Sequence, residues 1–426
     1  MVESEEHHSF FPTYNTTAQN FPNSTSNEQS SNSFINKSTL STNTKEIIEY
    51  SKYYKEGIRD PGEEGRKASR VLFLRSFNNW VKAVVINKYC RLLGTNLSVL
   101  DLCCGRGGDL KKYFNSKVKL YVGADLSEES LKNAIDRIRK IKNEKYSQGI
   151  PCKCFFITED ISHPSNHLME KIDKSYYFDL VSCQFAMHYH FESEVKIRAF
   201  LSNVVTRLCD GGYFIGSIIE DNVIVKRLRN RKYKENKYMN EKLTFGNEFY
   251  SIKFYSKYFP KEKGPYGIKY GFYLEDSIDK RDEEGNIKYV GEYLVIFDEF
   301  IKLCKEYDLY LVEKKNFTDF YEENVKNFGY KKMFTNMVND IDNSTKLQQW
   351  EIIQLYQIFV FRKGKKEFTY ESQNQRNRYN RGRRDDNNNI NDNKDVNKGD
   401  KYIPYLYKNP ITFKDTNPLM IGESFE

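Results

Sequence analysis

Residues 98–109 read SVLDLCCGRGGD, and the fold follows from this stretch. The apolar run at 98–102 is typical of a buried strand, and the three glycines after it indicate a tight turn. A helix is expected to begin near Asp109. A strand, a Gly-rich turn and a helix start form a corner that binds anions or nucleotides. The glycine spacing matches neither the G-x-G-x-x-G of dinucleotide folds nor the G-x-x-x-x-G-K-[ST] of P-loops.

Strands and helices alternate on both sides of this corner. The expected strands are at 119–124, 154–158, 178–182 and 213–219, with a turn at 210–212, and the expected helices are at 70–93, 128–142 and 194–208. Such alternation predicts an α/β fold with a mostly parallel, twisted sheet and helices on both faces. After residue 220 the expected elements are aromatic-rich strands or loops at 243–256 and 266–275, an amphipathic helix at 292–306, and a helix end with a last strand at 350–362.

Changes in composition divide the chain into three parts. Residues 1–43 are rich in Ser, Asn and Thr without a hydrophobic period, so a disordered polar tail is expected. Residues 366–426 form a low-complexity, Arg- and Asn-rich tail. Its basic segment at 376–384 either contacts RNA phosphates, acts as a nuclear import signal, or has no selected role. Residues 44–365 remain and are expected to form one domain.

Charge and cysteine content set further bounds. The net charge of +8 among 426 residues permits an anionic partner without proving one. No run of 18 apolar residues suggests a membrane span, and the amino terminus lacks the apolar core of a signal peptide. The eight scattered cysteines indicate reduced thiols in an intracellular protein.

A second informative stretch is FDLVSCQFAMHYHFE at 178–192, where an apolar strand ends in polar and aromatic residues. Such a cluster delivers side chains to a ligand at the carboxyl edge of a sheet. His188 and His190 form an H-x-H pair, but the sequence offers no third ligand, so no metal is expected.

Two carboxylates at strand ends suggest the ligand. Asp125 lies 20 residues after Gly105 and ends the second strand, where it can accept hydrogen bonds from both hydroxyls of a ribose. A ribose without a pyrophosphate suits S-adenosylmethionine, and Asp160 can hold its adenine edge. The alternative is that Asp101 and Asp125 only cap helices and the glycines only make a tight turn.

Several segments resemble the eukaryotic mRNA cap guanine-N7 methyltransferases. They are FNNWVKAVVI (77–86), DLCCGRGGDLKK (101–112), ADLSEESL (124–131), SCQFAMHYHFE (182–192), GGYFIGS (211–217), FGNEFYSIKF (245–254), GEYLV (291–295) and QLYQIFVF (354–361). The resemblance implies a Rossmann-like class I methyltransferase fold with a cap-binding insertion. It also implies methyl transfer from S-adenosylmethionine to guanine-N7 of the 5′ GpppN cap, giving m7GpppN and S-adenosylhomocysteine.

The resemblance also implies site residues. The expected donor contacts are Lys82, Gly105, Asp125, Asp160, Gln184 and Tyr189, with Cys103 where the family has a glycine. The expected cap contacts are Asn78, Asn79, Arg106, Lys112, Arg137, His188, Glu292 and Tyr356. A side chain at Cys103 crowds the methionine part of the donor unless it points away.

The chemistry needs no general base, because guanine N7 has a free lone pair and the sulfonium methyl is activated. His188, Tyr189 and Glu292 are therefore expected to position the substrates rather than to exchange protons. Glu292 suits the two donors on the Watson–Crick edge of guanine, and arginine suits the triphosphate. The alternatives are that Lys112 and Arg137 are solvated helix charges and that Glu292 favours a helix amino end.

Two other functions remain open on the sequence. One is a catalytically decayed cap-binding protein, suggested by Cys103; the other is a methyltransferase acting on another RNA or nucleotide. The expected partner is 5′-capped nascent mRNA in the nucleus, with no membrane. The K-x-D-G signature is absent, so a separate RNA triphosphatase and guanylyltransferase are expected, together with the transcription machinery.

Overall fold

The computed structural model describes residues 68–145, 152–229, 243–256, 264–276, 284, 286–338 and 344–364. All of them belong to one compact unit, Glu49–Glu426. The expected tails at 1–43 and 366–426 lie outside the described residues. The single-domain prediction for 44–365 stays a prediction.

The main sheet has seven strands in the order β10-β11-β5-β4-β1-β2-β3. Their bounds are β1 (Ser98–Leu102), β2 (Leu120–Asp125), β3 (Lys153–Thr158), β4 (Phe178–Gln184), β5 (Leu208–Ile219), β10 (Leu309–Asn316) and β11 (Tyr356–Lys363). The strands from β5 to β3 pair in parallel, whereas β11 runs antiparallel to both β5 and β10. This confirms the predicted α/β, Rossmann-like fold with a mostly parallel sheet.

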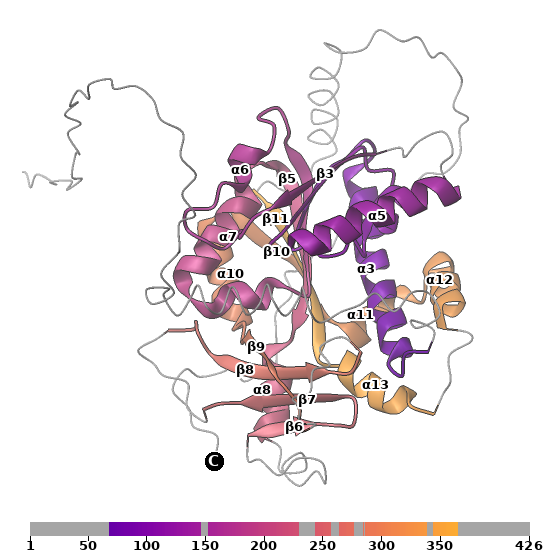
Figure 1. The fold of residues 1–426 in the computed structure, drawn as a ribbon, viewed down its shortest axis with the longest axis vertical. Helices are drawn as coiled ribbons and strands as arrows, with labels where there is room; N and C mark the ends of the chain where they lie inside the picture. Colours follow the sequence, from indigo (N-terminus) through magenta and orange to yellow (C-terminus); the bar gives the residue numbers. More distant parts are fainter. Residues whose placement is uncertain are drawn as a thin grey trace, which may run out of the picture. The chain divides into compact units, whose positions relative to one another are not determined.

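Helices cover both faces of the sheet (Figure 1). One face carries α3 (Leu72–Leu93), α4 (Leu110–Asn115) and α5 (Glu128–Lys145), and the other carries α6 (Leu168–Lys171), α7 (Glu194–Thr206) and α10 (Phe297–Glu306). Alternate strand residues enter the two cores: Val99 belongs to the first and Leu100 to the second. Burying such a side chain contributes roughly 1.5–3 kcal/mol, so the period-two pattern holds the layers together.

Both tryptophans of the chain lie in an aromatic cluster around α3, Trp80 on α3 itself and Trp350 on a helix packed against it. Phe77 contacts Trp80 and Trp350 at centroid distances of 6.0 and 5.3 Å. The other helices around α3 are α11 (Phe317–Asn324), α12 (Phe328–Val338) and α13 (Lys346–Ile353). The cluster fixes the helix whose next residues, Asn78 and Asn79, are predicted cap contacts.

The segment of sequence between β5 and β10 forms a second sheet. Its antiparallel strands are β6 (Thr244–Gly246), β7 (Tyr250–Phe254), β8 (Lys269–Leu274) and β9 (Val290–Tyr293), and they lie beside α8 (Asp221–Arg229) in Figure 1. The insertion that the family resemblance implied is therefore a separate four-stranded sheet.

Two sequence predictions are wrong in detail. The helix expected at 292–306 begins only at Phe297, where Asp221 Oδ2 accepts a hydrogen bond from its N–H at 3.1 Å. The preceding residues form β9, so Glu292 does not lie at a helix amino end. The turn expected at 210–212 lies inside β5, where Gly211 has φ 72° and the register with β4 shifts.

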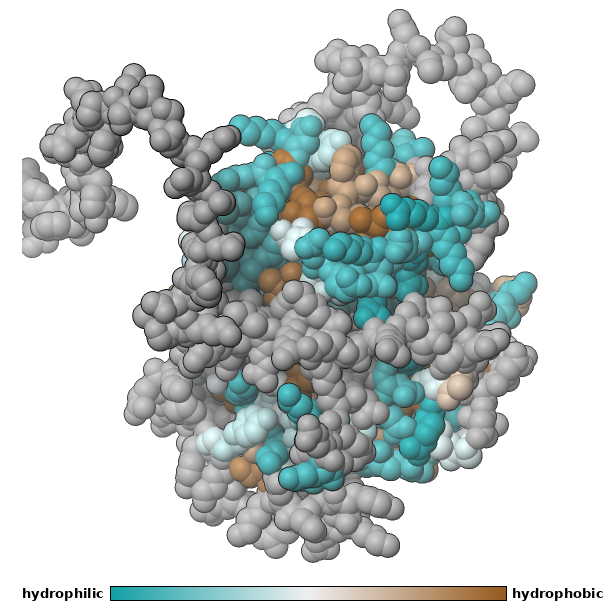
Figure 2. Space-filling model, in the orientation of Figure 1, coloured by the Kyte–Doolittle hydropathy of each residue, from teal (hydrophilic) through white to brown (hydrophobic). Residues whose placement is uncertain are grey.

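The free edge of the main sheet at β3 is the clearest hydrophobic area in Figure 2. Phe155 is 44% exposed there, and the strand begins with the exposed Lys153. Charged residues at an edge strand oppose pairing with another chain. No helix among the described residues is long and apolar enough to cross a membrane.

Candidate active site

The Gly-rich turn joins β1 to α4 and lies against the end of β2. Gly105 and Gly107 have φ of 52° and 65°, a region that only glycine adopts freely. Cys104 N donates to Ala124 O at 3.1 Å, which fixes the turn on β2. The strand–turn–helix corner predicted from 98–109 is thus confirmed.

Asp125 holds this corner together. Its Oδ2 accepts a hydrogen bond from Gly105 N at 2.8 Å, and its Oδ1 accepts one from Ser127 N at 2.9 Å. Burial raises the pKa of Asp125, although these two backbone hydrogen bonds oppose the shift. Each oxygen keeps a lone pair, so the carboxylate can still accept both hydroxyls of a ribose.

The helix-cap alternative fails for Asp101, which lies buried within β1 and accepts a hydrogen bond from Tyr121 OH at 2.9 Å. Asp160 follows β3, and its Oδ1 accepts hydrogen bonds from the N–H and the hydroxyl of Ser162 at 3.1 and 2.9 Å. The carboxylates of Asp125 and Asp160 therefore follow neighbouring parallel strands, as predicted.

Lys82 and Lys112 share one buried carboxylate. Asp109 Oδ1 lies 2.9 Å from Lys82 Nζ and 2.7 Å from Lys112 Nζ, and Lys112 also donates to Asn79 Oδ1 at 3.2 Å. Burial alone raises the pKa of Asp109, but the two ammonium groups outweigh it and lower the pKa. Lys112 is only 13% exposed, so it is not a solvated helix charge.

Asp109 was not among the predicted site residues. The only signal in the sequence was its place at the end of the Gly-rich turn, which fits a helix start equally well. Asn78 lies on the same helix as Lys82, and its buried Oδ1 has no hydrogen-bond partner among the described residues.

Arg137 reaches back from α5 to the Gly-rich turn. Its Nε donates to Arg106 O at 3.0 Å, and both side chains are half-buried. Arg137 is therefore not simply a solvated helix charge, because it holds the backbone of the turn.

A cavity of about 270 Å³ lies next to this corner. Seven predicted residues line it: Asn78, Asn79, Lys82, His188, Tyr189, Glu292 and Tyr356. Sequence reasoning missed Arg75, which also lines it. The signal that would have found Arg75 is the i, i+3/i+4, i+7 spacing of one helix face, which it shares with Asn78, Asn79 and Lys82.

Glu292 and His188 form a buried pair in the cavity wall. Glu292 Oε1 lies 3.4 Å from His188 Nε2, and Glu292 Oε2 accepts a hydrogen bond from Tyr270 OH at 2.6 Å. Burial raises the pKa of Glu292 to about 8 and lowers the pKa of His188 to about 3. The contact therefore joins two neutral groups near pH 7 and is not an ion pair.

Neither ring nitrogen of His188 has a hydrogen-bond partner among the described residues. Unpaired buried polar groups are rare in folded proteins, and here they face a cavity. Tyr356, also in the cavity wall, is held neutral because burial, and then Glu292, raise the pKa of its phenol. The wall thus offers neutral and unpaired polar groups to a ligand.

Gln184 and Tyr189 come from the end of β4 and from η1 (Met187–Glu192). Gln184 Oε1 accepts a hydrogen bond from Ser217 Oγ at 2.8 Å, and its Nε2 donates to Ser182 Oγ at 3.2 Å. The Tyr189 ring meets the His188 ring edge-on at 4.1 Å between centroids. One short segment therefore positions residues predicted for both substrates.

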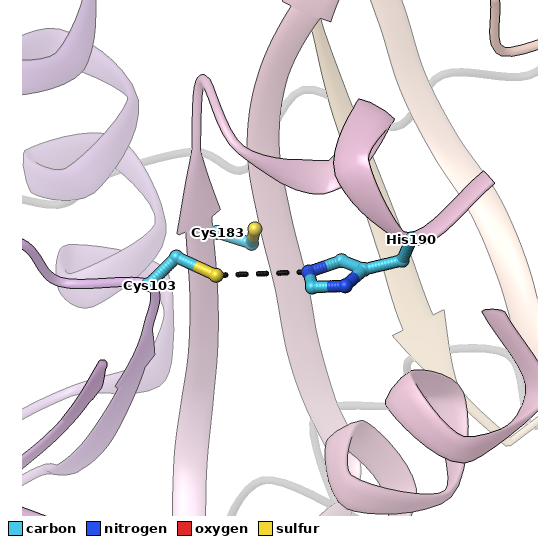
Figure 3. A group of neighbouring side chains, drawn as sticks. All are labelled: Cys103, Cys183 and His190. Carbon is cyan, nitrogen blue, oxygen red and sulfur yellow. Dashed lines mark hydrogen bonds between the residues drawn. The ribbon is translucent and has the colours of Figure 1, made fainter. Parts of the chain in front are cut away.

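Cys103 adopts φ 57°, the conformation for which the family's glycine is suited. Its Sγ lies 3.6 Å from His190 Nε2 and next to Cys183 (Figure 3). The side chain is thus turned toward the apolar core that also contains Cys183. The direction of this side chain removes the reason to expect crowding of a donor.

Comparison with known proteins assigns the chain to a family. Residues 36–364 match the model of the mRNA (guanine-N(7))-methyltransferase domain. The chain is 36% identical over 311 residues to mRNA cap guanine-N(7) methyltransferase 1 of Oryza sativa subsp. japonica, covering 70% of this chain and 77% of that protein.

Two fungal relatives agree. Identity to the mRNA cap guanine-N(7) methyltransferase of Schizosaccharomyces pombe is 33% over 309 residues, covering 71% of this chain and 79% of that protein. The namesake from Cryptococcus neoformans is 35% identical over 308 residues, but the chain spans only 46% of its length.

The similarity to solved structures is more distant. An S-adenosylmethionine-dependent methyltransferase from Clostridium acetobutylicum is 16% identical, with a TM-score of 0.37, covering 76% of this chain and all of that one. The family model spans both the Gly-rich corner and the inserted sheet. The chain belongs to the mRNA (guanine-N7)-methyltransferase family.

Proposed function

We propose that this chain transfers the methyl group of S-adenosylmethionine to N7 of the guanine in the 5′ GpppN cap of mRNA. The observation that carries the proposal is the buried Glu292–His188 pair, which faces a cavity beside the Gly-rich corner. Membership of the family supplies the reaction, and the geometry supplies roles for residues.

Glu292 reads the guanine. Guanine presents N1–H and the 2-amino group as adjacent donors, and a carboxylate accepts both. Near pH 7 the carboxyl of the free protein is protonated, because burial raises its pKa to about 8. Binding of guanine therefore releases its proton, and the neutral His188 ring is left to hydrogen-bond the base.

Asp125, Asp160 and the Gly105 turn hold the methyl donor. The half-buried Asp125 carboxylate at the end of β2, with lone pairs remaining, fits the ribose of S-adenosylmethionine. Gln184 and Tyr189 approach the same donor from β4 and η1. The donor supplies an activated methyl group, so the protein's residues need only bind and orient.

The cap triphosphate meets a positive corner. Lys82 and Lys112 carry two positive charges against the single negative charge of Asp109, which leaves one net positive charge. Arg106 and Arg137 extend this charge along the turn. An arginine fork binds phosphate oxygens in pairs, which also orients the cap.

Rate enhancement comes from position. Holding two reactants in line can lower a barrier by roughly 7–11 kcal/mol. Guanine N7 attacks with a free lone pair and carries no proton, so the step needs no general base. His188 and Glu292 are 6% and 2% exposed, so water has little access to this part of the site.

The experiment measures transfer of labelled methyl to RNA capped with guanosine or with inosine, which lacks the 2-amino group. Wild-type protein should prefer the guanosine cap, since inosine loses one hydrogen bond to Glu292, worth roughly 1–3 kcal/mol when its partner is left unpaired. Glu292→Ala should lose most activity and all discrimination. Donor binding without transfer to any capped RNA would refute the proposal.

The alternative of a decayed cap-binding protein rested on Cys103. That side chain points toward His190 and Cys183, so nothing in the site favours decay. We further propose that the chain acts in the nucleus on nascent capped mRNA. A separate RNA triphosphatase and guanylyltransferase would prepare the cap, and the transcription machinery would deliver it.

A further inference from the structure

Cys103, Cys183 and His190 bring three metal-binding atoms together beneath the Gly-rich turn (Figure 3). They come from three segments, namely the turn that follows β1, the strand β4 and the helix η1. Their sulfur and nitrogen atoms all lie within 4.8 Å of one another, and no other such group occurs among the described residues. His190 of the H-x-H pair therefore lies beside two thiols, whereas His188 is not part of the group.

The spacing of these atoms suits a tetrahedral metal. Bonds of about 2.3 Å to sulfur and about 2.05 Å to nitrogen, at a tetrahedral angle, place the two ligand atoms about 3.6 Å apart. The distance from Cys103 Sγ to His190 Nε2 is 3.6 Å. Without a metal the same two atoms form a hydrogen bond between the thiol and the imidazole (Figure 3).

His190 is held with its Nε2 toward the sulfurs. Its ring stacks on Phe200 at 4.2 Å between centroids and 17° between planes, and the residue is 5% exposed. Its Nδ1 has no hydrogen-bond partner among the described residues. A metal would bind Nε2, and Nδ1 would carry the proton of the neutral ring.

The charge balance also fits. Two thiolates neutralise a divalent cation, so occupancy adds no net charge to the apolar core around Cys183. Cys103 adopts a left-handed φ of 57°, where glycine has no strain. A side chain kept in a strained conformation suggests a use for that side chain.

We propose that Cys103, Cys183 and His190 bind Zn²⁺, or a cation of similar affinity for sulfur, and that the metal ties the Gly-rich turn to η1. The fourth position of a three-ligand site is open to an exogenous ligand. The metal takes no part in the proposed methyl transfer. The metal site is tested independently of that function, because metal binding is measured directly.

The experiment uses the reduced, tag-free, metal-free full chain and Co²⁺ as a probe. We expect one equivalent of Co²⁺ to give thiolate-to-cobalt charge-transfer absorption and the visible bands of a tetrahedral site, and one equivalent of Zn²⁺ to abolish them. Zinc binding should release protons from the two thiols, measured as the buffer dependence of the binding enthalpy. It should also raise Tm by several degrees.

Variants locate the site. Cys183→Ala should lower zinc affinity by more than about 100-fold, since loss of a group that merely orients a ligand already costs 10–100-fold. Cys304→Ala is the matched control, because Cys304 is equally buried in the same core but outside the cluster. Cys103→Gly restores a residue suited to φ 57° and should fold while losing the metal.

Three results would overturn the proposal. The first is no charge-transfer absorption in the wild-type protein. The second is equal zinc affinity in wild type, Cys183→Ala and Cys103→Gly, which places the metal elsewhere. The third is a Cys103–Cys183 disulfide in protein purified without reductant, together with no cobalt spectrum, which makes the cluster a redox pair instead.

Discussion

Replacing Glu292 by Gln should stabilise the protein, by an amount that grows with pH. Burial raises the pKa of this carboxyl from 4.5 to about 8, and the group is 2% exposed. Between these pH values the folded protein holds one more proton than the unfolded chain, so stability falls as pH rises. Gln does not titrate, and its amide oxygen can still accept the hydrogen bond from Tyr270 OH.

The size of the effect follows from the shift. The difference of 8 − 4.5 = 3.5 in pKa corresponds to about 5 kcal/mol at 1.36 kcal/mol for each unit. The advantage of Glu292→Gln should be near zero at pH 4.5, about 2 kcal/mol at pH 6 and about 5 kcal/mol at pH 9. All other titrating groups are common to both proteins and cancel in the difference.

Urea unfolding followed by tryptophan fluorescence measures this difference at the three pH values. Trp80 and Trp350 both lie in the aromatic cluster around α3, so the signal reports the main core. Glu322→Gln, at an exposed position, is the control and should show no such dependence. A pH-independent difference, or wild type more stable at pH 9, would show that Glu292 is ionised and paired, and would refute the neutral-pair interpretation.

Four further outcomes follow from the same structure. Glu313→Gln should destabilise the protein, because Lys88 and Tyr89 lower the pKa of that buried carboxyl against the effect of burial. The loss of unfolding free energy should shrink as acid protonates Glu313, and a pH-independent loss in urea unfolding would contradict this prediction. Asp109→Asn should cost about 3–5 kcal/mol, since two buried ammonium groups lose their shared carboxylate; an unchanged urea midpoint would contradict that reading. Cys103→Gly should bind S-adenosylmethionine as well as wild type or better by calorimetry, and markedly weaker binding would mean that the thiol supports the donor site. Cap affinity should fall up to tenfold for each pH unit below about 8, because guanine requires the Glu292 carboxylate; equal cap affinity at pH 6 and 8 in fluorescence titration would count against this role.

Local sequence patterns predicted the nucleotide-binding half of the fold closely. The strand expected at 98–102 is β1, and the expected helix at 128–142 lies within α5. These elements are strongly periodic, and each pattern follows from burial on one or both faces. Asp125 and Asp160 were placed correctly because parallel strands bring their carboxyl ends to one edge.

The inserted half was harder to predict. EYLVIFDEFIKLCKE contains apolar spacing compatible with one long helix, but β9 and α10 divide it. The division depends on pairing between β8 and β9 and on Asp221, which accepts a hydrogen bond from Phe297 N across 76 residues of sequence. No local period contains such long-range partners, so the sequence misplaced Glu292 on a helix.

The protonation states of the site residues also could not be predicted from the sequence. Family resemblance selected Glu292 and His188, but the resemblance carries no protonation state. That state depends on the burial of both groups by residues from several elements, with Tyr270 on β8 meeting Glu292 on β9. Above pH 8 the buried Glu292 carboxylate destabilises the folded protein when no cap is bound, and the same carboxylate accepts hydrogen bonds from guanine. The pH-dependent loss of stability and the selectivity for guanine therefore have one cause. A variant such as Glu292→Gln, which removes the loss of stability, must also remove the selectivity.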